Sequence, residues 1–235
     1  MSEQHAEEHG NMTTSRLNAL RAAVLGANDG IVSVAGIVVG VAGATTSLSA
    51  IFTAGIAGLV AGGLSMAAGE YVSVSSQRDT EKAMLSKEKM ELKTYPKAEK
   101  AELTQLYVDK GLTPDTARRV ADELTAHDAF AAHAEVELKI DPDDLNNPWH
   151  AALASSASFL SGAIIPFIAI LVAPKSHRVL ITFIAVLVAL VLTGLLSAKV
   201  SGVRPAKATA RVVIGGAVAM IITYAIGSLV GQHNL

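Results

Sequence analysis

Long apolar stretches and one polar interruption divide this chain. Five stretches are long enough to cross a membrane as helices: 22–45, 49–76, 150–173, 179–198 and 212–231. A helix needs ~20 residues to cross ~30 Å of hydrocarbon. Charged residues are rare within these stretches and are concentrated in the segment 77–149. The pattern predicts an all-α, polytopic membrane protein with five transmembrane helices and a helical insert between spans two and three.

The insert is expected to be a water-soluble helical domain. Two dipeptides mark helix starts within it, Tyr95-Pro96 and Thr113-Pro114, since Pro is favoured at the first helical position. We expect three or four amphipathic helices, the first of which continues directly from span two. The predicted division of the chain is 1–21 as an N-terminal tail, 22–76 as spans one and two, 77–149 as the insert, and 150–235 as spans three to five.

The composition supports a membrane protein and excludes several kinds of site and targeting segment. The chain is 51% hydrophobic but only 4% aromatic, and it has no Cys, which excludes disulfides, zinc–thiolate sites and iron–sulfur clusters. The first fifteen residues are polar and acidic, unlike a cleaved secretory signal. We expect no nucleic-acid partner.

Basic residues indicate the orientation. They precede span one, occur throughout the insert and crowd the loop between spans four and five, for example at Lys199, Lys207 and Arg211. With five spans these three regions share one side, which the positive-inside rule makes cytosolic. We therefore expect the N-terminus and the insert in the cytosol and the C-terminus outside, although Lys175 and Arg178 on the opposite side oppose this weakly.

Asp29 is the acidic residue inside the first apolar stretch. At about 1.5 Å per residue it lies ~10 Å from the cytosolic end of span one, within the hydrocarbon. An ionised carboxylate at that depth is costly unless it faces protein or water, so Asp29 is a functional candidate. Alternatively, span one begins at Ile31 and Asp29 is an interfacial cap in an Asn-Asp-Gly turn.

Span two offers partners for Asp29. Met66 and Glu70 are four residues apart and therefore share one face of a helix. If spans one and two form a hairpin, Met66 lies at about the depth of Asp29, and Glu70 lies at the inner mouth. A carboxylate with a thioether favours a divalent transition metal over magnesium or calcium. Ordinary packing is the alternative reading of Met66.

The insert contains two pairs of glutamates at helical spacing. Glu88 and Glu91 are three residues apart, and Glu99 and Glu102 repeat this spacing. The Tyr-Pro dipeptide between the pairs is expected to fold the two helices toward each other. The alternatives are a solvated face on which Glu and Lys alternate, or a surface that binds a basic partner.

Three further candidates follow in the stretch AHAEVEL, namely His133, Glu135 and Glu137. Clustered carboxylates with an imidazole suit hard or borderline divalent ions such as manganese or ferrous iron. Zinc or another divalent ion is also a candidate for binding in the insert.

Two segments resemble a known family. LGANDGIVSVAGIVVGVAGA (25–44) and LSMAAGEYVSVSSQRD (64–79) are similar to the first two spans of the vacuolar iron transporter family, the ferrous-iron and manganese transporters of plants, yeast, parasites and bacteria. The five expected spans and the place of the insert match the family's architecture. The chain resembles a bacterial member that has the cytosolic metal-binding domain.

The resemblance implies roles for individual residues. Asp29 and Met66 match the Asp and Met of the family's translocation path, which both subunits of a homodimer line. His133 and Ala134 stand where plant members carry two adjacent Met residues, so the thioether part of that site is missing here. The glutamates of the family's metal-binding domain correspond to Glu88, Glu91, Glu99, Glu102 and Glu137.

Together these features predict a transporter, and not an enzyme, that moves ferrous iron, manganese or both out of the cytosol. Moving a divalent cation against an inside-negative potential costs ~2.3 kcal/mol per charge per 100 mV. No phosphate-binding loop is present to couple this to hydrolysis, so we expect exchange for protons. The expected location is a prokaryotic cytoplasmic membrane.

Two other functions are open. One is a membrane-anchored di-iron carboxylate oxidase, although no Glu has a His three residues later, as such oxidases require. The other is a membrane-anchored sensor whose insert binds metal or a partner without transport.

Overall fold

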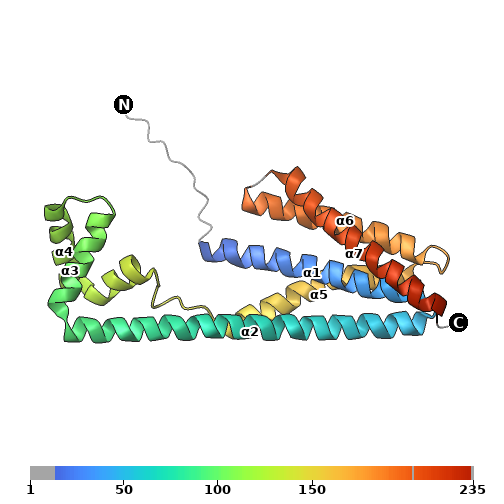
Figure 1. The fold of residues 1–235 in the computed structure, drawn as a ribbon, viewed down its shortest axis with the longest axis horizontal. Helices are drawn as coiled ribbons and strands as arrows, with labels where there is room; N and C mark the ends of the chain where they lie inside the picture. Colours follow the sequence, from blue (N-terminus) through green and yellow to red (C-terminus); the bar gives the residue numbers. More distant parts are fainter. Residues whose placement is uncertain (1–13, 203, 234–235) are drawn as a thin grey trace, which may run out of the picture. The chain divides into compact units, whose positions relative to one another are not determined.

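The computed structural model describes residues 14–202 and 204–233, so most of the expected N-terminal tail lies outside the described residues. The described chain is helical and contains no strand (Figure 1). Its elements, in order, are α1 (Thr14–Ala44), α2 (Leu48–Thr94), α3 (Pro96–Asp109), α4 (Pro114–His133), η1 (Ala134–Leu138), α5 (Pro148–Val172), α6 (Arg178–Ser201) and α7 (Pro205–His233).

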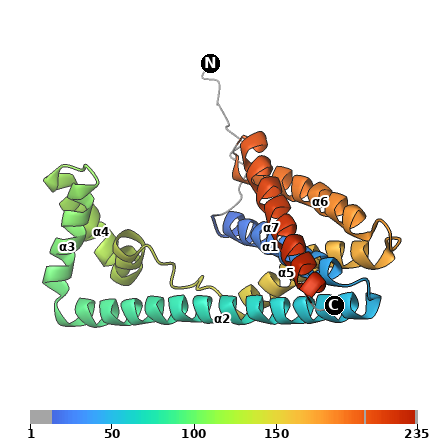
Figure 2. The ribbon, with the colours of Figure 1, turned by 45° about the vertical axis from the view of Figure 1, so that its right-hand side comes forward.

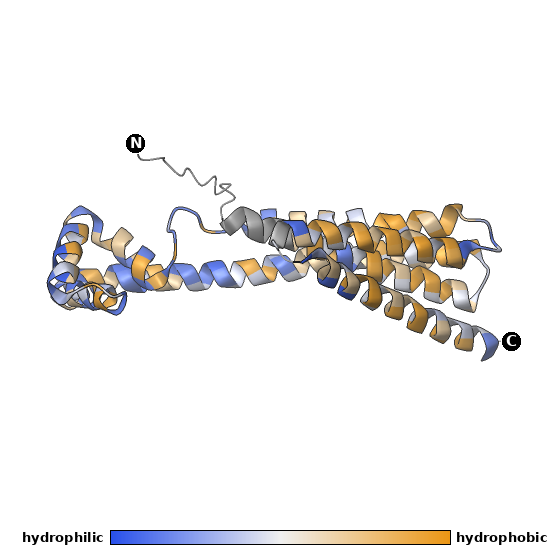
Figure 3. Cartoon of the chain, turned by 90° about the horizontal axis from the view of Figure 1, so that it is seen from above, coloured by the Kyte–Doolittle hydropathy of each residue, from blue (hydrophilic) through white to orange (hydrophobic). Residues whose placement is uncertain are grey.

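Five helices are long and apolar enough to cross a membrane, which confirms the predicted class. They are α1 from Ala22 onward, α2, α5, α6 and α7. Hydrophobic residues predominate along these helices, whereas hydrophilic residues predominate in the insert (Figure 3). Ile168, Leu192 and Ile222 are examples of large apolar side chains that are exposed on three different spans. Such surfaces are stable against lipid and not against water.

The chain forms two compact units. One contains the chain up to Glu70 and from Ala152 onward, and the other is Tyr71–Ala151. The helix α2 contributes to both units, because it runs from Leu48 to Thr94 and so carries span two into the insert. We call the first the membrane unit and the second the insert unit.

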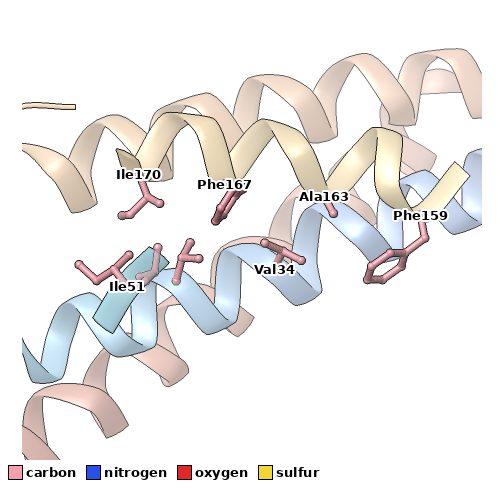
Figure 4. Close-up of a cluster of buried hydrophobic side chains, with 8 residues drawn as sticks. Val34, Ile51, Phe159, Ala163, Phe167 and Ile170 are labelled. Carbon is pink, nitrogen blue, oxygen red and sulfur yellow. The ribbon is translucent and has the colours of Figure 1, made fainter. Parts of the chain in front are cut away.

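α1 lies at the centre of the membrane unit. Its Val34 and Val38 side chains pack into an apolar cluster with α5, to which Phe159 and Phe167 contribute (Figure 4). Ile31 and Ala35 of α1 pack into a second cluster, with residues of α6 and α7. α1 is therefore held from two sides, and the residues beside Ile31 and Val34 have fixed positions.

The insert unit is built around a pair of packed helices, α3 and α4 (Figure 2). Each begins with Pro at its first position, Pro96 and Pro114, where the missing N–H costs no hydrogen bond. Gly111, with φ +99°, follows the end of α3 and allows the chain to turn. Leu103 of α3 and Ala121 of α4 form the apolar core of this unit together with Ala132 and Val136.

Candidate metal centre

The membrane unit places Asp29 beside a tight helix crossing. A Cβ atom on Gly30 would overlap the carbonyl group of Phe159, and one on Gly162 would overlap the carbonyl group of Ala27. Only glycine allows the backbones of α1 and α5 to meet this closely at both positions. Asp29 therefore belongs to a segment of α1 whose position is fixed by backbone contact.

The carboxylate of Asp29 is exposed on the surface of the membrane unit. Its Oδ1 accepts a hydrogen bond from Ser33 Oγ at 3.0 Å, one helical turn further along α1. The neighbouring Asn28 faces α6, where its Oδ1 accepts a hydrogen bond from Thr193 Oγ1 at 3.5 Å. Asp29 thus has one local partner and is open on its other side.

Met66 and Glu70 lie on the membrane part of α2. Met66 is half-buried and packs against the apolar cluster that contains Val34 and Phe159. Glu70 is half-buried at the last position of the membrane unit along α2. Met66 therefore has a packing role in the subunit, and a role for its sulfur in an ion path stays a prediction.

In the insert unit, a kink in α4 positions a second candidate site. Asp128 has φ −158° and ψ 97°, which interrupts the helix. Its Oδ1 then accepts a hydrogen bond from the Ala131 N–H at 2.9 Å, so Asp128 caps the restarted helix. The restarted segment passes into the π-helix η1, which ends at Lys139 with φ 56°. This segment carries His133 and Glu137.

Three carboxylates converge on one imidazole nitrogen. His133 Nδ1 lies 3.0 Å from Glu88 Oε1, 3.1 Å from Glu137 Oε2 and 3.9 Å from Glu99 Oε2. The exposed fractions of His133, Glu88 and Glu99 are 0%, 2% and 7%. These side chains come from α2, α3 and the end of α4, so packing of the insert unit brings them together.

Burial makes the charged forms of this cluster costly. The pKa values of Glu88 and Glu99 are raised, first by burial and then by a neighbouring carboxylate, which is Glu137 for Glu88 and Glu102 for Glu99. His133 acts in the opposite direction on both. A cation among these oxygens would compensate for their repulsion.

The donor set fits a divalent cation. Glu88 Oε1 and His133 Nε2 are buried and have no hydrogen-bond partner among the residues that the structure describes. Glu88, Glu99 and His133 each offer a ligand atom, and these atoms lie within 4.8 Å of one another. Buried polar atoms are normally paired, so an unpaired carboxylate oxygen that faces an imidazole indicates space for a ligand. We call these three residues the Glu–His cluster.

The remaining predicted residues lie around this cluster. Glu91 is half-buried, and its Oε2 is 3.1 Å from Lys87 Nζ. Glu102 and Glu135 are exposed. The structure thus brings Glu88, Glu99, His133 and Glu137 together and leaves Glu102 and Glu135 at the surface. Asp128 has no predicted role, and its only signal in the sequence is that Asp is a good helix cap within an otherwise helical pattern.

The five apolar helices define an integral membrane protein, and the Glu–His cluster gives it a candidate site for a metal ion. The model of the VIT family matches residues 20–228, and the chain belongs to this family.

Relatives that align with most of this chain support the assignment to the family. The chain is 42% identical to the vacuolar iron transporter of Acanthamoeba castellanii, over 92% of this chain and 80% of that protein. It is 33% identical to vacuolar iron transporter homolog 2.1 of Arabidopsis thaliana, over 92% of this chain and 84% of that protein. It is 32% identical to VIT-like transporter 1b of Glycine max, over 94% of this chain and 80% of that protein.

Proposed function

We propose that this protein transports ferrous iron, manganese or both out of the cytosol in exchange for protons, and that it is not an enzyme. The observation that carries the proposal is the pairing of two features in one VIT-family chain. A spanning helix exposes the carboxylate of Asp29, and an insert buries a Glu–His cluster that fits a divalent cation. The relatives named as vacuolar iron transporters support iron as cargo.

The insert collects the ion in this account. Glu88, Glu99, His133 and Glu137 supply three carboxylates and an imidazole, which are donors for borderline divalent ions. Glu91, Glu102 and Glu135 add negative charge near the cluster and raise the local concentration of cations. The insert then delivers the ion to the membrane path, where Glu70 assists at the inner mouth.

Asp29 exchanges the ion for a proton. Its carboxylate is open on one side and has a single hydrogen bond from Ser33, so it is free to bind a cation or a proton. Export of a divalent cation against 100 mV costs ~4.6 kcal/mol before any concentration gradient. Protons entering down the same potential return ~2.3 kcal/mol each, so two protons per ion would supply this energy, and protonation of Asp29 would release the ion outside. Met66 is the proposed thioether ligand beside it.

The exposure of Asp29 supports the proposed homodimer. An ionised carboxylate on a spanning helix does not face lipid, so the exposed side of Asp29 is covered by protein or by water held in protein. Phe52, Ile56 and Val60 of α2 are also exposed and lie at helical spacing on one face. We propose that a second copy of the chain completes the path at Asp29, with the N-terminus and insert in the cytosol of a prokaryotic cell.

Flux in liposomes tests this function. The purified protein is reconstituted with a metal-quenched dye and a pH dye inside, and ferrous iron and manganese are added with and without a proton gradient. We expect metal movement in one direction and proton movement in the other. Metal binding by the protein without flux would overturn the transporter and favour the membrane-anchored sensor.

A further inference from the structure

We propose that His133 determines the ion preference of the Glu–His cluster and makes it favour ferrous iron and similar borderline ions over manganese. The inference rests on the proposed role of the insert in collecting metal, and it adds the class of ion that is collected. The position and the burial of the imidazole support this inference.

The distances around the imidazole match those between ligands of one ion. Oxygen and nitrogen ligands of a divalent transition metal lie ~2.0–2.2 Å from it, which places neighbouring ligand atoms about 3 to 4 Å apart. His133 Nδ1 lies 3.0, 3.1 and 3.9 Å from oxygens of Glu88, Glu137 and Glu99. Donor atoms of Glu88, Glu99 and His133 lie within 4.8 Å of one another, so an ion bound by these two carboxylates has a ring nitrogen of His133 within reach as a third ligand.

Burial prevents the imidazole from leaving the site. His133 has no exposed surface, and its neighbours Ala132 and Ala134 are also buried. Nδ1 has the geometry of a hydrogen bond with Glu137, yet Glu88 Oε1, equally close to it, has no hydrogen-bond partner. Two carboxylates thus compete for one ring nitrogen, and an ion that binds all three groups would satisfy both.

The nitrogen changes which ion binds best. A site of carboxylates alone suits manganese, magnesium and calcium, whereas imidazole suits iron, nickel, copper and zinc. Affinities for a given site also rise from manganese through ferrous iron to cobalt and nickel. An imidazole among the carboxylates strengthens this trend, so His133 excludes manganese in favour of ferrous iron more strongly than a fourth carboxylate would.

A purely structural imidazole makes a different prediction. If His133 is protonated and serves only as the ion-pair partner of Glu88 and Glu137, it binds no metal. Its replacement would then change folding stability and would leave the ratio between metal affinities unaltered.

Competition titrations on the full-length protein in detergent separate these cases. Affinities for manganese and for cobalt, an air-stable probe, are measured at one pH for the wild type, His133→Gln and His133→Glu, with anaerobic ferrous iron as a third ion. We expect the cobalt-to-manganese affinity ratio to fall about tenfold in both variants. The control His127→Gln, at an exposed position of the same helix, should keep the wild-type ratio.

A spectroscopic measurement on the wild type does not depend on how the variants fold. Pulsed electron paramagnetic resonance of bound manganese should show coupling to one directly bound nitrogen, and His133→Gln should lose it. Bound metal without nitrogen coupling, or an unchanged affinity ratio in a His133→Gln protein with wild-type helicity, would overturn this inference alone. Absence of any metal binding by the wild type would overturn it together with the proposed role of the insert.

Discussion

The two units of this molecule hold their carboxylates in opposite ways. In the membrane unit, Asp29 is exposed and has one hydrogen bond, from Ser33 on the same helix. In the insert unit, Glu88 and Glu99 are buried and face an imidazole. An open carboxylate exchanges ligands easily, whereas a buried set of donors holds an ion in fixed geometry. In the proposed function, this difference corresponds to passage of the ion at Asp29 and capture of the ion by the Glu–His cluster.

The largest effect is expected at Asp29. Asp29→Asn should abolish metal flux into liposomes, because an amide neither neutralises a cation nor exchanges a proton at this depth. The helical content of the variant should be that of the wild type. Asp144→Asn, at an exposed position of the insert unit, removes one carboxylate elsewhere and should retain full flux. Normal flux in Asp29→Asn would refute proton exchange at this residue.

The tight crossing beside Asp29 provides the next test. Gly162→Val places side-chain atoms against the Ala27 carbonyl group and should lower the free energy of unfolding by about 1–3 kcal/mol or more. Gly215→Val is the matched control, because a Cβ atom at Gly215 meets no atom within 4 Å. Thermal unfolding in detergent compares them. Equal midpoints for the two variants would show that the crossing does not determine the position of α1.

Metal binding by the Glu–His cluster should depend on pH. Burial raises the pKa values of Glu88 and Glu99, so metal affinity should rise with pH in a window above the usual glutamate pKa of ~4.3. In the metal-free protein, these two groups change stability in the opposite direction. Glu88 and Glu99 bind protons more tightly in the folded state than in the unfolded state, so their contribution to stability is fully present at low pH and is lost as pH rises through their raised pKa values.

Titrations of metal affinity against pH check this window. Glu102→Gln should move it slightly toward lower pH, because the charge of Glu102 is the second cause of the raised pKa of Glu99. Glu123→Gln, at an exposed position of α4, should leave it in place. A window at the usual glutamate pKa in the wild type would contradict burial of the cluster.

The smallest effect is expected at the kink of α4. Asp128→Ala removes the cap on the Ala131 N–H and should cost about 1 kcal/mol of stability. Metal affinity should fall a few-fold, since the restarted helix carries His133 and Glu137. Asp128→Asn should restore both properties, and Glu123→Ala should change neither. Unaltered affinity in Asp128→Ala would show that the cap does not position the cluster.

Much of the fold could be predicted from hydropathy, because an apolar stretch of about 20 residues is long enough to span a bilayer as a helix. Spans one, three and four, at Ala22–Ala44, Pro148–Val172 and Arg178–Lys199, lie near the predicted positions. Span two begins near its predicted start, at Leu48, but its helix continues without a break to Thr94. The fifth helix begins at Pro205, earlier than the predicted 212, because its first turns carry Lys207 and Arg211 and are polar enough to escape a hydropathy criterion. Pro at N1 places its start there.

The site could be predicted by residue type but not by arrangement. The spacing of Glu88 and Glu99 indicates helical faces, and the roles of these residues in metal binding stay predictions. Neither the kink at Asp128 nor the π-helix that follows has a periodic signature, because both replace regular helix within a helical pattern. Without them, no spacing rule brings His133 to Glu88.

The concentration dependence of metal flux tests the division of roles most directly. Initial flux is measured in liposomes over a range of ferrous iron concentrations for the wild type, Glu88→Gln and Asp29→Asn. If the Glu–His cluster captures the ion and Asp29 passes it, Glu88→Gln should raise the half-saturating concentration about tenfold and keep most of the maximal flux. Asp29→Asn should remove the maximal flux. Loss of maximal flux in Glu88→Gln, with saturable flux retained in Asp29→Asn, would contradict this division of roles.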